Sequence, residues 1–285
     1  MTARENSLLL TIICPDKIGI VADVSRFLAE HRCNIVESAQ FEDPLENQFF
    51  MRVAFMPEGE YGLDALRTAF GPTGEKHHMQ WQMMPQSTPM RTLVMVSKFG
   101  HCLNDLVFRH KIGALPIDLR MVVSNHGTFE QFTQANGLPF THIPVTPETK
   151  AQAERQLIDI IEGEEIELII LARYMQVLSD AFCARYSGRI INIHHSLLPS
   201  FKGAKPYHRA HERGVKLVGA TAHYVTADLD EGPIIEQGVT AVRHNMTPDD
   251  LVAKGREVET TVLSTAVQLH SERRVFLNGK RTVVF

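Results

Sequence analysis

The sequence lacks the features of a membrane protein, a disulfide-stabilised protein or a nucleic-acid-binding protein. Its 285 residues contain no apolar run of the roughly 18–20 residues that a membrane-spanning helix needs. Its four cysteines are scattered and form no Cys-x-x-Cys pair, which favours reduced thiols over a disulfide framework. The net charge of -4 lacks the basic excess that non-specific nucleic-acid binding requires. We therefore expect a cytoplasmic protein with no nucleic-acid partner and no membrane partner.

Several catalytic signatures are also absent. No Gly-x-Gly-x-x-Gly follows the first predicted strand of the second segment, and no Gly-x-Ser-x-Gly occurs, which argues against a dinucleotide fingerprint and against a nucleophile elbow. His194, His195, His208 and His211 suggest a metal, but no glutamate completes a His-Glu-x-x-His motif and no cysteine stands nearby. We expect no metal site and interpret these histidines as lining a pocket or lying at the surface.

The charge is divided unevenly along the chain. Residues 1–86 hold 7 basic and 12 acidic side chains, whereas the remainder holds 22 and 21. The change coincides with Pro-Gln-Ser-Thr-Pro at residues 85–89, a polar stretch flanked by prolines that is typical of a linker. The sequence therefore predicts a domain over residues 1–84, a linker over 85–90 and a second domain over 91–285.

The first segment has the pattern of a ferredoxin-like βαββαβ domain. Apolar runs of strand length alternate with two stripes of helical spacing, one after Asp16, a candidate N-cap, and one that Gly71 is expected to end. The predicted strands cover residues 8–14, 34–41, 49–56 and 79–83. This order of elements is the split βαβ arrangement.

The turn between the first strand and the first helix resembles that of an ACT domain, a regulatory module. The similar residues are Cys-Pro-Asp-Lys-Ile-Gly-Ile-Val at 14–21 and Asn-Ile-Val at 34–36. The resemblance implies an effector site near Asp16, Gly19 and Ile20, because a glycine at this turn lets ligand groups approach the backbone. Gly19 is equally well explained as a tight turn without a ligand, and both interpretations stay open.

ACT domains commonly pair side by side and bind amino acids at the seam. The resemblance therefore implies a homo-oligomer whose contacts include residues 7–84. It also implies an amino-acid effector, with glycine and methionine as candidates. Because some ACT domains serve only for assembly, an effector does not follow from the fold alone.

The second segment alternates strands and helices, which predicts a doubly wound, mostly parallel α/β sheet. Thr247-Pro248-Asp249-Asp250 is a good helix start, and the helix should run to about Ser271 before Asn278-Gly279 closes a hairpin. The predicted strands cover residues 91–97, 119–124, 140–145, 168–172 and 189–193. The predicted helices lie near residues 103–110, 128–136, 147–162 and 248–271.

Polar residues follow a buried strand in this segment. Asn192 and His194 are two residues apart, so they project from the same side at the carboxyl end of a strand, where ligands bind in open α/β sheets. An amide donor, an imidazole and a later carboxylate, Asp230, suit attack on a carbonyl. From spacing alone, caps and turn formers explain these residues about as well.

Two longer motifs resemble those of the folate-dependent formyltransferase family. They are Asn-Ile-His-His-Ser-Leu-Leu-Pro at residues 192–199 and His-Tyr-Val-Thr-Ala-Asp-Leu-Asp-Glu-Gly-Pro at residues 223–233, and the resemblance covers residues 91–285. It implies that Asn192, His194 and Asp230 are catalytic, with His223 beside them. It also implies that two segments line the folate pocket, with Met175, Gln176, Val177, Leu178, Thr226, Asp228 and Leu229.

The domain layout selects among the activities of this family. A glycine-rich phosphate loop is expected in members that use a phosphorylated acceptor, but residues 97–102 read Ser-Lys-Phe-Gly-His-Cys, and Phe99 and His101 fill space that a phosphate would need. An ACT-like domain joined to a formyltransferase-like domain resembles the hydrolytic branch, in which water replaces the amine. The resemblance thus implies hydrolysis of 10-formyltetrahydrofolate to formate and tetrahydrofolate, in one-carbon metabolism and formate supply for purine synthesis.

The implied mechanism needs no cofactor, because the folate is the substrate. Asp230 accepts a hydrogen bond from water and takes its proton, directly or through His194, while His194 and Asn192 donate to the oxyanion. Two alternatives stay open: formyl transfer to an amine, and a catalytically silent amino-acid sensor that keeps the fold. The intact residues Asn192, His194 and Asp230 argue against the sensor.

Overall fold

The computed structural model describes residues 6–59, 61–199 and 206–285. These fall into two compact units. The first holds the chain up to Thr88 together with Glu272–Phe276 and Val283–Phe285, and the second holds Pro89–Ser271 and Leu277–Thr282. This division differs from the sequence-based one, which assigned all residues after 90 to the second domain.

Contacts of the C-terminal residues explain the difference. Within the first unit, the ring of Phe276 meets that of Phe50 edge to face, with centroids 6.0 Å apart. The buried guanidinium of Arg52 donates to the carbonyl oxygen of Glu272 (3.2 Å). No local pattern in the sequence indicates these contacts, since they join residues more than 200 positions apart.

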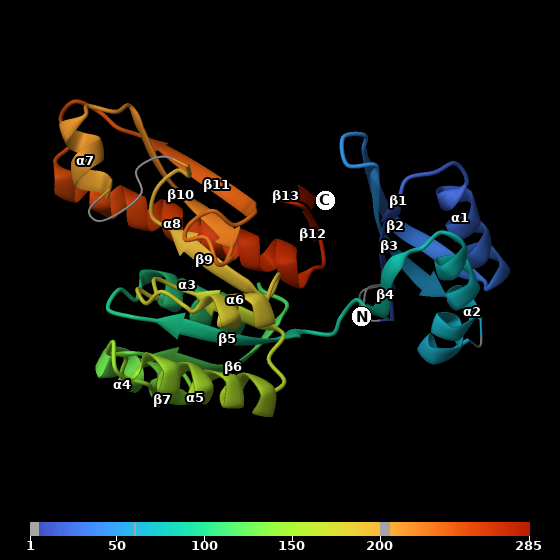
Figure 1. Cartoon of the computed structure of the whole chain (residues 1–285), viewed down its shortest axis with the longest axis horizontal. Coiled ribbons are helices and arrows are strands. Elements are labelled where there is room, and N and C mark those ends of the chain that lie inside the picture. Colours follow the sequence, from blue (N-terminus) through green and yellow to red (C-terminus); the bar gives the residue numbers. More distant parts are fainter. Residues whose placement is uncertain (1–5, 60, 200–205) are drawn as a thin grey trace. The chain divides into compact units, whose positions relative to one another are not determined.

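The first unit is a four-stranded antiparallel sheet in the order β2-β3-β1-β4. Its elements are β1 (Leu8–Pro15), α1 (Ile20–Glu30), β2 (Cys33–Asp43), β3 (Gln48–Pro57), α2 (Leu63–Lys76) and β4 (Gln80–Pro85). The predicted βαββαβ order is confirmed (Figure 1).

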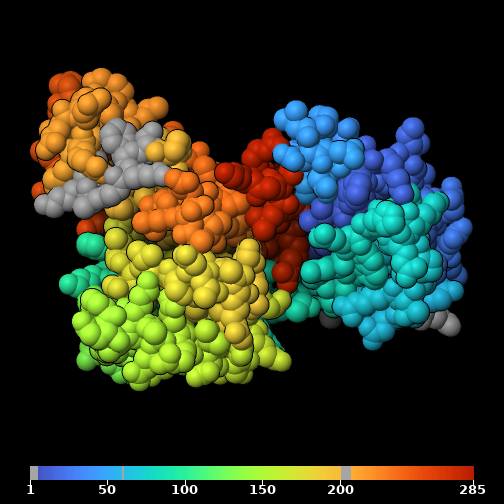
Figure 2. All heavy atoms as spheres, viewed as in Figure 1, coloured from blue at the N-terminus to red at the C-terminus, as the bar shows by residue number. Residues whose placement is uncertain are grey.

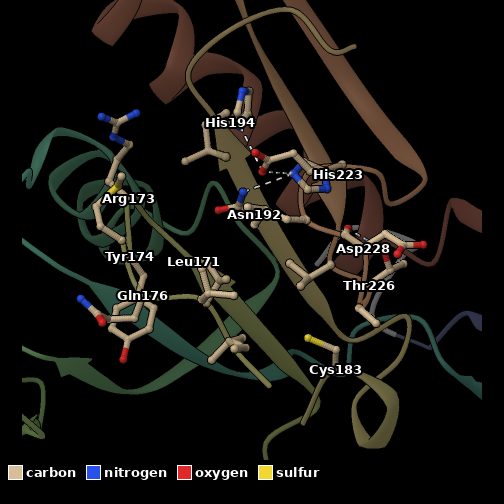
Figure 3. A pocket seen from close by; sticks show the side chains of 18 of the residues that line it. Leu171, Arg173, Tyr174, Gln176, Cys183, Asn192, His194, His223, Thr226 and Asp228 are labelled. Carbon is tan, nitrogen blue, oxygen red and sulfur yellow. Dashed lines mark hydrogen bonds and ion pairs between the residues drawn. The ribbon is translucent and has the colours of Figure 1, made fainter. Parts of the chain in front are cut away.

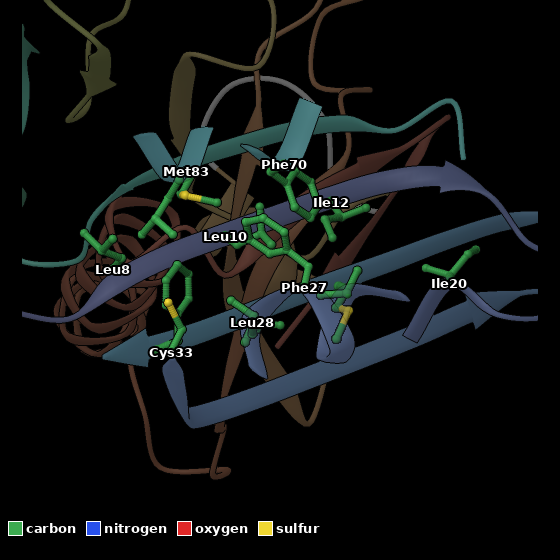
Figure 4. Close-up of a cluster of buried hydrophobic side chains, with 14 of the residues drawn as sticks. Leu8, Leu10, Ile12, Ile20, Phe27, Leu28, Cys33, Phe70 and Met83 are labelled. Carbon is green, nitrogen blue, oxygen red and sulfur yellow. The ribbon is translucent and has the colours of Figure 1, made fainter. Parts of the chain in front are cut away.

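The core of this unit follows from the period-2 pattern of β1. Leu8, Leu10 and Ile12 share one face of the strand and are buried against apolar side chains of the helices, such as Leu28 (Figure 4). Phe27 packs edge to face on Phe70, with ring centroids 5.0 Å apart.

Two predicted helix boundaries in this unit are wrong. The first helix begins at Ile20, with Gly19 rather than Asp16 at its N-cap, because glycine adopts the φ of 100° that this turn requires. The second helix does not end at Gly71 but continues to Lys76. Its last turn is held by packing: a Cβ on Gly74 would lie 2.4 Å from the indole nitrogen of Trp81.

The second unit is built on a seven-stranded sheet in the order β11-β10-β9-β8-β5-β6-β7. Its strands are β5 (Met90–Val96), β6 (Ile117–Ser124), β7 (Phe140–His142), β8 (Leu168–Leu171), β9 (Ile190–His194), β10 (Leu217–Tyr224) and β11 (Ile234–Ala241). Its helices are α3 (His101–Lys111), η1 (Gly127–Phe129), α4 (Glu130–Ala135), α5 (Lys150–Gly163), α6 (Asp180–Arg185), α7 (Pro206–Glu212) and α8 (Pro248–Ser271). The hairpin β12 (Val275–Asn278) and β13 (Arg281–Val284) follows.

The predicted doubly wound, mostly parallel sheet is confirmed. Strands β5 to β9 pair in parallel, whereas β10 pairs antiparallel with both β9 and β11. Strands β10 and β11 were not predicted from the sequence, although apolar residues alternate with others from Val218 to Tyr224. Side chains of α5 and α6 form one apolar core with residues of β5 and β8, while α8 packs against α3 and β10.

The predicted start of the long helix α8 is confirmed. The amide of Asp250 donates to Thr247 Oγ1 (3.2 Å) and the amide of Thr247 donates to Asp250 Oδ2 (2.8 Å), which forms a reciprocal cap. The predicted hairpin turn at Asn278-Gly279 is also present, with Gly279 at a φ of 60°. Among the helices of the described residues, none has the length and hydropathy that a membrane span requires.

Candidate active site

A cavity of about 340 Å³ lies at the carboxyl ends of β8 and β9 in the second unit. Its walls come from these strand ends, from the end of β10 and from the two loops that follow β8 and β10. Figure 2 shows yellow atoms of the chain around α6 meeting orange atoms of the β10–β11 segment on one face. The cavity therefore lies where open α/β sheets bind ligands.

The neighbouring strands β9 and β10 bring three polar side chains together: Asn192, His194 and His223 (Figure 3). Asn192 and His194 project from the same side of β9, and His223 on β10 is the register partner of Asn192. The ring of His223 donates from Nδ1 to the carbonyl oxygen of Tyr224 (2.9 Å), so its Nε2 accepts from the amide nitrogen of Asn192 (3.2 Å). Burial lowers the pKa of His223, which agrees with a neutral ring in this role.

The loop after β10 brings Asp230 to these residues. Its backbone is in the left-handed region at a φ of 58°, a conformation that aspartate tolerates better than most residues. Gly232 lets the loop approach the strand, because a Cβ there would lie 1.7 Å from the carbonyl oxygen of Tyr224. The amide of Tyr224 donates to the carbonyl oxygen of Pro233 (2.9 Å), which fixes the loop.

Asp230 and His194 form a hydrogen-bonded pair. Nδ1 of His194 lies 3.2 Å from Oδ1 of Asp230, and Nε2 of His223 lies 3.9 Å from the same oxygen. The hydrogen bond from His194 lowers the pKa of Asp230 below 3.8 and outweighs the opposing effect of burial, so the carboxylate is ionised. Nε2 of His194 is buried and has no hydrogen-bond partner among the described residues, so the ring keeps one unused nitrogen.

The residues predicted for the folate pocket also line this cavity. Both loops contribute apolar side chains that are more than half exposed: Met175, Val177 and Leu229. The first loop is fixed by Ser97, whose Oγ accepts from the amide of Met175 (2.9 Å). The structure thus brings together all eleven predicted residues: Asn192, His194, His223, Asp230, Met175, Gln176, Val177, Leu178, Thr226, Asp228 and Leu229. Their individual roles stay predictions.

Eight other lining residues were not selected from the sequence as site residues, and two of them, His195 and Arg173, are basic. His195 was expected only to line a pocket or lie at the surface, and it lines the cavity. Burial, together with the nearby charge of Arg173, lowers its pKa to about 4. Arg173 was not predicted as a site residue, although it lies between the end of β8 and the predicted pocket residues Met175–Leu178, and its φ of 64° turns the chain there.

The predicted effector residues lie in the first unit. Gly19 is the N-cap of α1 with a φ of 100°, and nothing lies within 4 Å of the position that its Cβ would take. Ile18 beside it is fully exposed, whereas the side chain of Ile20 is buried in the core. Ile20 therefore offers little accessible surface to an effector.

One group in the described residues has metal-ligand chemistry: His101, Cys102 and Glu259, whose ligand atoms lie within 4.8 Å of one another. It does not include the four histidines weighed from the sequence. The Glu259 carboxylate accepts from Nε2 of His101 (2.7 Å), and a guanidinium nitrogen of Arg173 lies 3.6 Å away. An arginine beside the carboxylate favours an ion-pair network over a metal ion.

Comparison with known proteins agrees with both units. The formyl transferase family model matches residues 90–267, and the ACT domain model matches residues 8–60. A formyltetrahydrofolate deformylase from Corynebacterium sp. (strain P-1) is 51% identical over 97% of both chains. The crystal structure of a formyltetrahydrofolate deformylase from Burkholderia mallei is 52% identical, with a TM-score of 0.95, and covers 98% of this chain and 99% of that one.

A more distant neighbour matches a smaller part of the chain. The crystal structure of glycinamide ribonucleotide transformylase 1 from Symbiobacterium toebii is 28% identical, with a TM-score of 0.65, and covers 70% of this chain and 95% of that one. The nearly complete coverage by deformylases separates them from this transformylase, which covers 70% of the chain. The chain belongs to the formyltetrahydrofolate deformylase family.

Proposed function

We propose that this chain is an enzyme that hydrolyses 10-formyltetrahydrofolate to formate and tetrahydrofolate, with Asn192, His194 and Asp230 as its catalytic residues. The observation that carries the proposal is the grouping of these three side chains on one wall of a cavity whose mouth is formed by two partly apolar loops. The near full-length similarity to deformylases supports water as the acceptor.

His194 takes the proton from water in this mechanism. Because Asp230 has a lowered pKa, it is a weak base but a good hydrogen-bond acceptor. It holds a proton on Nδ1 of His194, which leaves Nε2 free to accept. The water proton moves to Nε2, and the hydroxide oxygen bonds to the formyl carbon.

Asn192 stabilises the negative charge that then develops on the formyl oxygen. One N–H of its amide is held by Nε2 of His223, which fixes the amide group, and the second N–H is available to the oxyanion. The C–N10 bond breaks as N10 takes the proton from Nε2 of His194. One water proton has then passed to N10 to give tetrahydrofolate, and the formic acid formed releases the other to solvent to give formate.

The loops that follow β8 and β10 provide the binding surface for the folate. Met175, Val177 and Leu229 expose apolar surface at the cavity mouth, which suits the flat ring system of a pterin. The mechanism invokes no metal or redox step, and the folate is a substrate. We place the reaction in one-carbon metabolism, where it supplies formate for purine synthesis, and in the cytoplasm, in accord with four free cysteines.

The test is an assay of the purified full-length protein with 10-formyltetrahydrofolate and no amine. Stoichiometric release of formate and tetrahydrofolate is expected. Formyl consumption that begins only when an amine is added would support the transferase alternative, and no turnover with any amine would support the silent sensor.

For the first unit we propose assembly and regulation. The match to the ACT domain supports the proposal, as does the exposure of Val36 and Phe41 on the edge strand β2, which suits side-by-side pairing of sheets. The open turn at Gly19 supports binding of a small amino acid, glycine or methionine, near Asp16–Ile20.

Activity and melting temperature titrated with each amino acid test this proposal, and sedimentation tests the oligomer. Gly19→Ala should weaken the response to the effector. Gly113→Ala is the matched control, since Gly113 in the second unit also has a positive φ and open space. A monomer in solution would contradict the proposed assembly. An equal response of both variants to the amino acid would contradict the assigned role of the turn at Gly19.

A further inference from the structure

The loop between β8 and α6, residues 172–179, forms one wall of the cavity, and we call it the β8–α6 loop. It supplies six of the residues that line the cavity. Two of its apolar side chains, Met175 and Val177, are 55% and 57% exposed. Such a loop gains free energy by collapsing, because collapse removes apolar surface from water. Its open shape therefore needs restraints from groups outside the cavity.

The first restraint is Ser97, directly after β5. Its amide donates to the carbonyl oxygen of Arg173 (3.3 Å), and its hydroxyl accepts from the amide of Met175 (2.9 Å). The same hydroxyl donates to Oδ1 of Asn125 (2.7 Å), which fixes its orientation. Ser97 and Asn125 are both buried. The start of the loop is therefore held by residues at the end of the sheet.

The second restraint is Glu154, a residue of the helix α5. Its Oε1 accepts from the amide of Ser179 (2.7 Å), and its Oε2 accepts from the hydroxyl of the same residue (2.5 Å). Ser179 is the N-cap of α6, and its Oγ accepts from the amide of Phe182 (3.2 Å). The two oxygens of one carboxylate thus hold the residue at which the loop ends and α6 begins.

Packing of α5 determines the position of Glu154. Ala153 and Leu157 on this helix are buried in the same apolar cluster as Tyr174 and Leu178 of the loop. Burial, together with the nearby carboxylate of Glu154, raises the pKa of Tyr174 to about 12. The carboxylate therefore lies beside the loop on a helix that the core holds in place.

Glu154 acts on the cavity without lining it. It is not among the described residues that form the cavity walls, but Leu178 and Cys183 are. Leu178 directly precedes Ser179, and the amide of Cys183 donates to the carbonyl oxygen of Ser179 (2.9 Å). A displacement of Ser179 would therefore move the end of the loop and the start of α6, where Figure 3 shows Cys183.

We propose that Glu154 is a positioning residue for the reaction, which holds the β8–α6 loop in the open shape that receives the folate. The inference rests on the proposed function for the identity of the ligand. Without Glu154, the amide and the hydroxyl of Ser179 lose their acceptor, and only Ser97 restrains the loop. The loop of the free protein then adopts other shapes, and binding weakens in proportion to the fraction of molecules that no longer have the open one.

The experiment compares Glu154→Ala with wild type in the full-length protein, by steady-state kinetics with 10-formyltetrahydrofolate. KM should rise at least about tenfold, as expected for the loss of hydrogen bonds to a carboxylate. The value of kcat should stay within about twofold, because contacts with bound folate then hold the loop. A role in folding alone would lower the melting temperature and the active fraction but would leave KM unchanged.

Two further variants at this position test the chemistry of the restraint. Glu154→Gln keeps an acceptor for the amide of Ser179 and can donate to its hydroxyl, so KM should return to within about threefold of wild type. Glu154→Asp keeps the carboxylate, but it is one carbon shorter and cannot reach both donors. It should raise KM in the same direction as Glu154→Ala, which keeps the test valid if the alanine variant does not fold.

Glu162→Ala is the matched control. Glu162 is also on α5 and pairs with Arg185 of α6, but both side chains are about half exposed. This variant should keep the KM of wild type. The proposal is overturned if the Glu154 variants that fold keep the KM of wild type, or if Glu162→Ala raises KM as much as Glu154→Ala does.

Binding of tetrahydrofolate, measured by titration calorimetry, separates this inference from the proposed function. If wild type releases no formate but binds tetrahydrofolate, and Glu154→Ala binds it at least about tenfold more weakly, the proposed function fails and the role of Glu154 is supported. If wild type releases formate but both proteins bind tetrahydrofolate equally, the role of Glu154 is refuted and the proposed function stands.

Discussion

Two carboxylates of the second unit, each paired with a histidine, differ in how completely they are satisfied. Asp230 keeps 16% of its side chain exposed, and its partner His194 has one nitrogen without a partner. Glu259 keeps 2%, and each of its oxygens accepts a hydrogen bond. An open hydrogen-bonding position therefore separates the candidate catalytic pair from a buried carboxylate whose oxygens all accept hydrogen bonds within the protein.

The backbone conformations of Asp230 and Glu259 also differ. Asp230 lies on a loop in the left-handed region, a conformation that costs stability and persists only when its surroundings enforce it. Glu259 lies in the middle of the 24-residue helix α8. We therefore expect substitutions at Asp230 to change activity and substitutions at Glu259 to change stability.

The largest effect is expected from Asp230→Asn. It keeps the size of the side chain but removes the charge that holds and polarises His194, so kcat should fall by about 10²–10⁴. The free energy of unfolding should change little. Steady-state kinetics and urea unfolding measure both, with the exposed Asp249→Asn as control. Wild-type turnover by Asp230→Asn would remove this residue from the mechanism.

Glu259→Ala should show the opposite profile. Leaving His101 and Arg173 without their buried partner should lower the free energy of unfolding by about 3–5 kcal/mol. The folded fraction should retain kcat within about tenfold of wild type, since the carboxylate takes no part in the proton transfer. Urea unfolding and active-site titration check this against the exposed Glu257→Ala. A large loss of kcat with an unchanged free energy of unfolding would contradict the structural role of Glu259.

Asn192→Ala tests the oxyanion role within the open site. Removal of one donor should lower kcat by about 10²–10³ with little change in KM. The exposed Asn104→Ala serves as control. An increase in KM at constant kcat would show that the amide binds substrate and transition state equally, and would refute the assigned role.

The smallest effect concerns His195, which lies between the two carboxylates. Its pKa is about 4 in the folded protein and 6.5 in the reference state, so the unfolded chain binds the extra proton between these values. The neutral ring contributes fully to the free energy of unfolding above pH 6.5. This contribution, about 3 kcal/mol, is lost as the pH falls toward 4.

Urea unfolding of wild type and His195→Gln over this range tests the prediction. As the pH falls from 6.5 to 4, the free energy of unfolding should decrease less for His195→Gln than for wild type. Parallel curves for the two proteins would be incompatible with a buried neutral His195.

Much of the fold could be predicted because its signals are local. The period-2 pattern of β1 and the cap at Thr247 depend on neighbouring residues, and both are found as expected. The start of α1 could not be placed from Asp16, because the turn needed the positive φ that only Gly19 supplies easily. The extension of α2 beyond Gly71 depends on packing against Trp81, which no local pattern shows.

For the candidate site, the shared face of Asn192 and His194 at a strand end could be predicted from the sequence, since alternation along a strand is a local property. The groups that they contact depend on the path of the whole chain. Asp230 reaches His194 because Gly232 lets its loop approach the end of β10, and Glu259 reaches His101 across 158 positions of sequence. Hydrogen bonds between distant segments leave no periodic trace in a sequence, because each partner is chosen by the path of the whole chain.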